Sequence, residues 1–470
     1  MKRWQQELEG RSVARTIRAA LIVGGLFGAV GMASAQTLRW LGTLGGGWSE
    51  ARGVSADGTV VIGISHDDQS RYRAFRWTAN GGMQDLGTLG GRNSMAYGMT
   101  PDGSKIVGTS ELNDSGEERA TLWEITDNGV NILNLGTLTF SGNFKRSAAY
   151  AISADGNTVV GYSYADQNQW GGAVHRACRW KLNTTPISIE QLDTNEDIDP
   201  DPNITRRRLT GVGSCAFAVS ANGEALTGVW GWGWGFVGFY WNDNAQNPSQ
   251  RNDLRGDRLY VLLGVTNVFN FDGRGTGYGI SADGKVAVGY ATDNQLNLRP
   301  ARWVYNPSNH ALDGPTFLGS LGGLFGTAHA TNQDGSIIVG WATLVNGEGH
   351  AFIWDAQNGM RDLNTVYANL LNDGSILERA IAITADGRFI VGVGYNAQTS
   401  RREAYLLDTV GQYRQREADV NGDGCVDDAD LLTVLFNFGA TGQNAADVNR
   451  DGTVDDADLL SVLFNFGGGC

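Results

Sequence analysis

The chain has 470 residues, which is enough for more than one domain, and its formal net charge is −14 at pH 7. Glycine is abundant (67 residues) and proline scarce (8), and a hydrophobic content of 41% excludes a disordered linker protein. The acidic balance argues against binding to nucleic acid or to anionic membranes, because both require a basic surface.

The first 35 residues have the pattern of a secretory signal peptide. Basic residues from Lys2 to Arg18 precede a short apolar core at 19–30, and Ala33-Ser34-Ala35 forms a small-residue cleavage site. A membrane anchor is the alternative, but the apolar run is short and rich in glycine, and no other segment is apolar enough to span a bilayer. We therefore expect a secreted protein, outside the cell or on its surface, with no integral membrane segment after cleavage.

Residues 51–63 have the form of a β-hairpin. Two short apolar strands flank Asp57-Gly58, and glycine adopts the positive φ that a tight turn needs. The pattern returns at intervals of roughly 45 to 67 residues, which is typical of propellers and solenoids. The further copies are 96–108, 149–161, 216–228, 277–289, 328–340 and 380–392.

Two more strands follow the hairpin in most repeats. The third commonly ends in a Trp, such as Trp77 or Trp123, and the fourth ends in a sequence like Leu-Gly-Thr-Leu, as at 83–89. Four strands in seven repeats predict an all-β, seven-bladed β-propeller over residues 37–408. The seventh repeat lacks a fourth strand, and 37–44 carries that sequence at the other end of the domain. We expect this N-terminal strand to complete the last blade and close the ring.

The recurring Trp and Asp residues allow two interpretations each. Trp77, Trp123 and Trp354 could be sugar platforms, but one aromatic at the same place in each blade favours packing between sheets. Asp57 and its equivalents could form a carboxylate array, but Asp before Gly favours a turn residue that bonds its own backbone. No nucleophile–base pattern or metal-binding His spacing stands out, so we assign no catalytic residue.

A separate candidate for ligand binding is the aromatic run at 230–236. Trp230, Trp232 and Trp234 alternate with glycine, so a strand would place three indoles on one face. Exposed, they would stack on the sugar rings of an extracellular polysaccharide. Buried, they would pack against neighbouring glycines, and the sequence leaves both interpretations open.

The repeats resemble the HAF family of bacterial extracellular repeats. Residues 349–363 contain His350-Ala351-Phe352, the triplet that names the family, and Leu-Gly-Thr-Leu-Gly-Gly at 41–46 and 86–91 is also similar to it. The resemblance covers most of residues 37–408, although only the sixth repeat keeps the triplet. It implies an exported protein and no established chemistry.

After a short polar linker at 409–418 the chain becomes strongly acidic. Two nearly identical segments, 28 residues apart, place side-chain oxygens at loop positions 1, 3, 5, 9 and 12, a backbone carbonyl at 7 and glycine at 6. This is the calcium-loop pattern of an EF-hand. The predicted ligands are Asp419, Asn421, Asp423, the Cys425 carbonyl, Asp427 and Asp430 in the first loop, and Asp447, Asn449, Asp451, the Thr453 carbonyl, Asp455 and Asp458 in the second.

Each loop is followed by an apolar helix, no helix precedes it, and position 12 is Asp where an EF-hand has Glu. In these respects residues 419–470 resemble a duplicated type I dockerin. The resemblance implies two Ca²⁺ ions and, as partner, a cohesin-like protein or a cell-surface component. A solvated acidic tail is the alternative, but it does not explain ligand spacing that occurs twice. Because the module is small and its carboxylates repel one another, we expect calcium binding to be coupled to folding.

Four cysteines in an exported chain predict two disulfides, Cys178–Cys215 and Cys425–Cys470, although the spacing allows other pairings.

Three functions follow from the sequence. It favours a secreted, non-catalytic binding or scaffold propeller that a calcium-dependent module tethers to its partner. The alternatives are a carbohydrate-active enzyme, such as a polysaccharide hydrolase or lyase with its active site at the propeller mouth, and a structural cell-surface protein.

Overall fold

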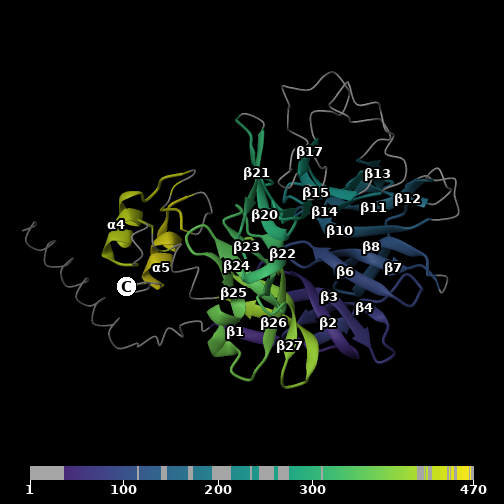
Figure 1. Ribbon diagram of the computed structural model, residues 1–470, viewed down its shortest axis with the longest axis horizontal. Helices are drawn as coiled ribbons and strands as arrows, with labels where there is room; N and C mark the ends of the chain where they lie inside the picture. The colour runs from purple at the N-terminus through teal and green to yellow at the C-terminus, as the bar shows by residue number, and fades with distance from the viewer. Residues whose placement is uncertain are drawn as a thin grey trace, which may run out of the picture. The chain divides into compact units, whose positions relative to one another are not determined.

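The chain divides into two compact units, one spanning Thr37–Thr409 and the other containing Met1–Gln36 and Val410–Cys470. The first is built mainly from strands, and the described part of the second contains two helices (Figure 1). In the ranges described below, no helix has the length and apolar character needed to cross a membrane. The computed structural model describes residues 36–113, 116–138, 145–167, 173–192, 213–232, 235–242, 259–262, 275–308, 311–409, 418, 420–421, 426–441, 444, 446–448, 453–464 and 466.

The strands of the first unit fall into antiparallel groups of four, and we number the groups in chain order. One parallel bridge, Trp48 opposite Arg402, joins the first and last groups into a single eight-stranded sheet. The first three groups are β2 (Gly45–Val54), β3 (Val60–Asp67), β4 (Tyr72–Thr78) and β5 (Gly82–Asp85); β6 (Ser94–Met99), β7 (Lys105–Glu111), β8 (Glu118–Thr126) and β9 (Gly129–Asn134); and β10 (Ser147–Ile152), β11 (Thr158–Gln167), β12 (Ala173–Lys181) and β13 (Ser188–Gln191).

The next three groups continue the same order. They are β14 (Ser214–Val219), β15 (Ala225–Trp232), β16 (Gly235–Asn242) and β17 (Leu259–Leu262); β18 (Gly275–Ile280), β19 (Val286–Thr292), β20 (Leu298–Asn306) and β21 (Ala311–Phe317); and β22 (Gly322–Thr331), β23 (Ile337–Leu344), β24 (Gly349–Asp355) and β25 (Gly359–Asp362). Figure 1 shows the groups following one another in chain order, as in a β-propeller.

The last group combines the two ends of this unit. It consists of β26 (Ile376–Ile383), β27 (Phe389–Asn396), β28 (Arg401–Asp408) and β1 (Thr37–Trp40). β1 runs antiparallel to β28, with Thr37 opposite Asp408. The Leu41 N–H then donates to the Ala404 carbonyl at 2.9 Å, just as Leu86 after β5 donates to Ala74 in β4 at 2.9 Å. β1 therefore holds the fourth-strand place beside β28, as the sequence predicts for this segment.

The hairpin turns bring neighbouring groups together. A Cβ added to the glycine of each turn would meet the first residue of the second strand in the preceding group at 2.4–3.2 Å. The pairs are Gly103 with Val60, Gly156 with Lys105, Gly223 with Thr158, Gly284 with Ala225, Gly335 with Val286, Gly387 with Ile337 and, between the first and last groups, Gly58 with Phe389.

The apolar core lies between neighbouring groups. One cluster joins Val107 and Leu122 of the second group to Val159 and Trp180 of the third. The repeated third-strand tryptophans are at most 8% exposed at Trp77, Trp123, Trp180, Trp303 and Trp354. They pack between the sheets, and the packing interpretation of the sequence is confirmed for these positions.

The fourth strands are shorter than the sequence predicts. β5 ends at Asp85 and β9 at Asn134, before their Leu-Gly-Thr-Leu segments. The reason is local: the Asp85 side chain accepts a hydrogen bond from the Gly87 N–H at 2.8 Å, and Asn134 accepts one from Gly136 at 2.9 Å, and such Asx turns end a strand. After β25, Asp362 likewise begins two short helices, α2 (Leu363–Val366) and η1 (Ala368–Leu370).

The C-terminal unit contains α4 (Asp428–Phe436) and α5 (Asp456–Phe464). Its apolar core is small and consists mainly of valines. The segments that contain the two predicted loops are connected by backbone hydrogen bonds from Gly439 to Val454 (2.8 Å) and from Val454 to Ala440 (2.9 Å). The core residues are Ala418, Val426, Val434, Ala446, Val448, Val454 and Val462.

Candidate functional site

The first predicted calcium loop ends in a carboxylate that is completely buried. Asp430 is 0% exposed in the first turn of α4. Its two oxygens accept hydrogen bonds from the backbone N–H groups of Asn421 (3.0 Å) and Asp427 (2.9 Å). Asp427 in turn accepts from the Ala429 N–H at 2.8 Å, so Asp427 and Asp430 form a capping box. The carboxylate at position 12 thus connects the loop to the start of the helix.

The second loop repeats this local structure. Asp458 is 0% exposed and accepts from the Asp455 N–H at 2.8 Å, while Asp455 accepts from the Ala457 N–H at 2.8 Å. Asp447, at the start of the loop, is 9% exposed. The duplication in the sequence is therefore also a duplication in the structure.

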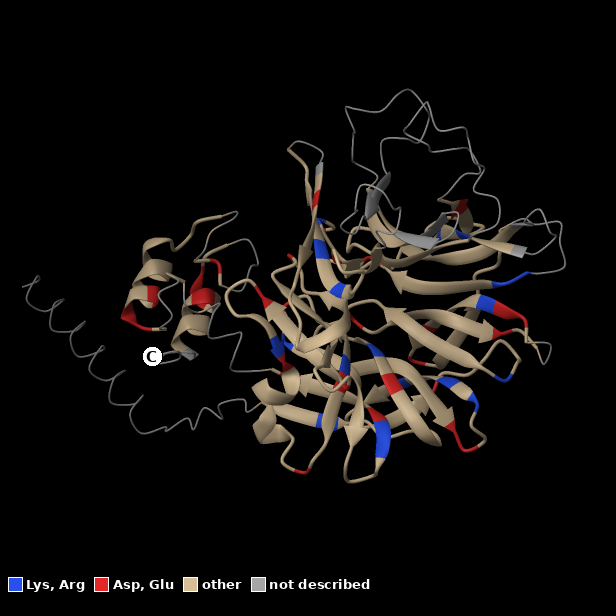
Figure 2. Ribbon diagram, in the orientation of Figure 1, with Lys and Arg blue, Asp and Glu red and all other residues tan. Residues whose placement is uncertain are grey.

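These residues fit a hard cation such as Ca²⁺. An ionised carboxylate is costly to bury unless it is paired or binds a metal. Residues 418–470 contain ten acidic residues and a single basic one, Arg450, so basic side chains can balance few of these charges. Figure 2 shows acidic residues at the beginnings of α4 and α5. All the predicted ligand atoms are oxygens, which are the ligands that calcium prefers.

The complete ligand sets stay predictions. Asp419, Asp423, Cys425, Asn449 and Asp451 lie outside the described residues. Among the residues that are described, no three His, Cys, Asp or Glu side chains gather in a group that could hold a metal ion. The described portion of each loop supplies the buried position-12 carboxylate and its backbone contacts.

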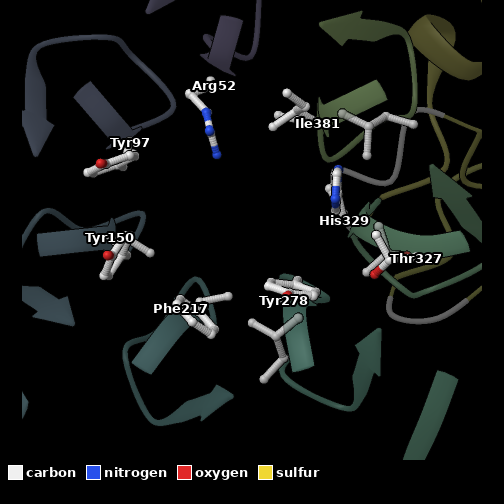
Figure 3. A pocket seen from close by; sticks show the side chains of 18 of the residues that line it. Arg52, Tyr97, Tyr150, Phe217, Tyr278, Thr327, His329 and Ile381 are labelled. Atoms are coloured by element: carbon white, nitrogen blue, oxygen red, sulfur yellow. The ribbon is translucent and has the colours of Figure 1, made fainter. Parts of the chain in front are cut away.

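A second candidate site is a cavity of about 720 Å³ in the propeller. The first strand of every group contributes one larger side chain at the same position of the hairpin repeat, the residue after the leading Ala or Gly. Figure 3 shows these side chains surrounding the cavity. They are Arg52, Tyr97, Tyr150, Phe217, Tyr278, His329 and Ile381, which we call the cavity ring.

Local backbone structure explains the position of the cavity ring. In each first strand the pairing register shifts across the ring residue, as between Ala51 and Gly53 or between Ala149 and Ala151. A β-bulge leaves one residue out of the ladder and redirects its side chain. The next residue is Gly or Ala in all seven repeats, which leaves the ring side chains room in the cavity.

Neighbouring members of the cavity ring contact one another. Six of them, from Arg52 to His329, form a continuous arc over six consecutive groups, and Ile381 of the seventh group is not part of it. The centre-to-centre distances are 5.7 Å from the Arg52 guanidinium to the Tyr97 ring, 4.9 Å from Tyr97 to Tyr150, 5.4 Å from Tyr150 to Phe217, 5.4 Å from Phe217 to Tyr278 and 5.9 Å from Tyr278 to His329.

The cavity ring carries little net charge at neutral pH. Arg52 Nε lies 2.5 Å from Oε1 of Glu50, so the guanidinium is balanced by a carboxylate behind it. Burial raises the pKa of Tyr97 to about 12 and lowers the pKa of His329 to about 4. Both groups are therefore neutral at pH 7. Of the described residues that line the cavity, none is Asp or Glu.

The Asp residues of the hairpin turns have a structural role. Asp57 accepts hydrogen bonds from the Ser55 hydroxyl (2.6 Å) and the Thr59 N–H (3.0 Å). These bonds lower the pKa of Asp57, the Ser55 contact most strongly. Asp102 makes the same contacts with Thr100 and Ser104. The turn interpretation from the sequence is confirmed here, and these carboxylates do not belong to the cavity lining.

One predicted disulfide is wrong. Cys178 and Cys215 are buried and not joined to each other. Cys178 lies on β12, the third strand of its sheet, in the core cluster around Trp180. Cys215 lies on β14, the first strand of the next sheet. The two thiols therefore lie on strands at different places in two neighbouring groups. Burial raises the pKa of Cys215, which disfavours its reactive thiolate. Cys425 and Cys470 lie outside the described residues.

The other aromatic prediction falls largely outside what can be described. Trp230 and Trp232 belong to β15, but their side chains are not among the described ones, and neither is any part of Trp234.

The sequence analysis did not identify the cavity ring. The available signal was a hairpin position that varies among Arg, Tyr, Phe, His and Ile, next to residues that are always small.

Residues 417–463 match the family of dockerin type I domains. This segment is a dockerin type I domain. Domains of this type bind calcium, which agrees with the two loops and their buried carboxylates. The match covers the C-terminal unit only, and the resemblance of the repeats to the HAF family stays a prediction. A search of curated proteins finds no match to the chain.

Three solved structures are similar to the chain at low identity. TolB from Acinetobacter baumannii has 14% identity and a TM-score of 0.37, with 65% of this chain and 63% of that one covered. Oligogalacturonate lyase from Vibrio parahaemolyticus has 10% identity and a TM-score of 0.49, with 80% of this chain and 94% of that one covered. The β-propeller domain of the Trilobed protease from Pyrococcus furiosus has 11% identity and a TM-score of 0.42, with 80% of this chain and 94% of that one covered. The chain thus spans less than two thirds of TolB, and similarities this weak say nothing about its activity.

Proposed function

We propose that this protein is a secreted, non-catalytic binding propeller whose calcium-loaded dockerin domain attaches it to a cohesin-type protein or a cell-surface component. The observation that carries the proposal is the dockerin domain itself, with a buried carboxylate at position 12 of each loop. A dockerin domain implies binding to cohesin. The propeller is then the part that this attachment delivers.

The propeller is a closed ring of seven four-stranded blades in this proposal. Two contacts between its ends support closure. β1 supplies the strand that the seventh group otherwise lacks, and Gly58 of the first group lies against Phe389 of the last. A closed ring has no unpaired sheet edge between its first and last blades, which protects it from edge-to-edge aggregation.

The dockerin domain holds two calcium ions in this proposal, one in each loop. The first would bind Asp419, Asn421, Asp423, the Cys425 carbonyl, Asp427 and Asp430, and the second the equivalent residues from Asp447 to Asp458. Calcium would neutralise carboxylates that repel one another in the empty loops, so its binding would drive folding of this unit.

Exposed apolar side chains on the dockerin helices support protein binding. Leu435 and Phe436 of α4 are 46% and 84% exposed, and Leu463 of α5 is 46% exposed. Leu432 and Leu460, at equivalent positions of the two helices, are 48% and 47% exposed. Exposed apolar residues that recur in this way are typical of interaction surfaces. Because the two copies are nearly identical, either one could make the same contact with a partner.

A binding role for the propeller is favoured over a two-carboxylate glycosidase. Glycosidases of that kind need a pair of Asp or Glu residues facing the scissile bond. The described cavity lining contains neither residue type. A lyase at the same cavity is the alternative, because its tyrosines and His329 could exchange protons with a substrate. Release of reducing ends, or of unsaturated uronates absorbing in the ultraviolet, would support an enzyme instead.

The test is calorimetric titration of the full-length protein with a panel of type I cohesin domains, with calcium and then with excess chelator. We expect binding with calcium and none without it. The double variant Leu435→Asp and Leu463→Asp should lose binding, whereas Val345→Asp, on the propeller and 86% exposed, should keep it. Binding that survives chelation, or that the double variant leaves intact, would contradict the proposal.

A further inference from the structure

The cavity ring has the features of a ligand site that the dockerin domain does not explain. One hairpin position varies while the residues around it are small, and a bulge turns that position into the cavity in all seven first strands. The cavity volume of about 720 Å³ lies within the range of roughly 300–1,000 Å³ that is usual for ligand sites.

We propose that the central cavity binds a short neutral oligosaccharide, or the end of a longer neutral glycan, stacked on the arc of Tyr97, Tyr150, Phe217 and Tyr278. Sugar rings have apolar C–H faces that pack on aromatic faces and hydroxyl edges that need hydrogen bonds. The aromatic arc supplies the first kind of contact. Tyr278 is 37% exposed, so part of its surface is open to a ligand.

The other side of the cavity supplies the polar contacts. Figure 3 shows Arg52 across the cavity from Phe217 and Tyr278, with Thr327 and His329 between them along one side. His329 Nδ1 faces the Ala380 carbonyl at 3.2 Å, which assigns its proton to that nitrogen and leaves Nε2 as an acceptor. Guanidinium, hydroxyl and imidazole groups together offer both donors and acceptors to sugar hydroxyls.

The charges of the site favour a neutral ligand. A cation would gain from the aromatic faces but would meet Arg52 at the same arc. An anion would have to compete with Glu50, which already pairs with Arg52 at 2.5 Å. Neutral hydroxyl groups meet neither obstacle. The lining is also uneven: among the described residues, Tyr290, Phe325 and Trp341 add aromatic surface on the fifth and sixth groups and not on the others. The longer part of a glycan should extend toward these residues.

The experiment is calorimetric titration of the calcium-loaded, full-length protein with the linear hexaoses of glucose, xylose and mannose. Hexagalacturonate and choline serve as the acidic and cationic comparators. We expect at least one neutral hexaose to bind, and to bind more tightly than either comparator. Tyr150→Ala and Tyr278→Ala should each weaken that binding about tenfold or more, because each removes an aromatic contact surface.

Three controls make the result decisive. Tyr72→Ala removes a tyrosine of β4 that is 42% exposed and outside the cavity lining, so it should bind like the wild type. Tyr278→Phe keeps the ring and should retain most of the affinity, even if the alanine variants are less stable. Chelation should leave glycan binding intact while it abolishes cohesin binding, so the two proposals fail separately.

No binding of any neutral hexaose at millimolar concentration would overturn the inference. A clear preference for hexagalacturonate or choline would overturn it as well. So would equal affinities of the wild type, Tyr150→Ala and Tyr278→Ala, because a bound glycan would then lie elsewhere on the protein.

Discussion

The propeller and the dockerin domain solve the problem of folding in opposite ways. The propeller buries large apolar side chains between successive sheets, including Trp123 and Trp180 at 0% exposure. The dockerin domain has a small core of valines and alanines, and it buries Asp430 and Asp458 at 0% exposure as well. Apolar burial stabilises a fold by itself, whereas a buried carboxylate is costly unless it is paired or binds a cation. The contrast implies that one unit folds independently of calcium and the other does not.

The largest effect should follow calcium removal. Chelation leaves the loop carboxylates uncompensated, so the helices α4 and α5 should unfold while the propeller stays folded. Circular dichroism reports the helices, and tryptophan fluorescence reports the propeller because residues 410–470 contain no Trp. A helical signal that ignores the chelator, or a fluorescence change that follows it, would remove the contrast between the two units.

The second effect is a loss of packing in the propeller. Trp180→Ala should lower the free energy of unfolding by about 3–5 kcal/mol, because it opens a cavity between the second and third groups. Denaturant unfolding followed by tryptophan fluorescence measures this loss. Val130→Ala, at a side chain 43% exposed, should change stability by less than about 1 kcal/mol. Calcium affinity should be unchanged in both variants, and a change would mean that the two units are coupled.

The third prediction tests ring closure. Gly58 and Gly359 have similar positive φ angles of 72° and 66°, so alanine at either position should cost about 1–2 kcal/mol in backbone strain. A Cβ at Gly58 would also lie 2.5 Å from the Phe389 ring, whereas none of the heavy atoms around Gly359 would come within 4 Å. The free energy of unfolding of Gly58→Ala should therefore be lower than that of Gly359→Ala by about 1–3 kcal/mol. Equal unfolding free energies would argue that the first and last groups do not meet.

A fourth prediction separates the buried carboxylate from its exposed neighbour in the first loop. Asp430→Asn removes a predicted charged ligand and should weaken calcium binding to that loop about tenfold or more. Asp428→Asn changes the same kind of side chain two residues earlier, where it is exposed, and should have little effect. Calcium titration of both variants measures the difference, and equal affinities would remove Asp430 from the ligand set.

The smallest expected effect concerns acid. The hydroxyl and N–H donors around Asp57 lower the pKa of its carboxyl below the ordinary 3.8. The ionised form therefore stabilises the turn above about pH 4, and that contribution is lost as the pH falls through the lowered pKa. Asp57→Asn cannot ionise, so its fluorescence-detected stability should fall less than that of the wild type between pH 5 and pH 2. A parallel fall in both proteins would exclude a contribution from Asp57.

The sequence by itself determined the repeat, the hairpin turns and the dockerin domain. These features are local: Asp57 and Gly58 define a turn within a few residues, and the predicted ligands of each calcium loop lie within twelve positions of the chain. Local patterns also identified the strand at Thr37–Trp40, because it carries the sequence that the seventh repeat lacks.

Only the tertiary structure decided what the repeats form together. The cavity ring draws one side chain from each first strand, so residues as far apart as Arg52 and Ile381 become neighbours of one cavity. The separation of Cys178 from Cys215 likewise depends on which strand of which sheet each occupies. A repeat pattern shows which positions are equivalent, but the direction of a bulged side chain and its distance from other blades follow from backbone pairing and from the packing of sheets around a common centre.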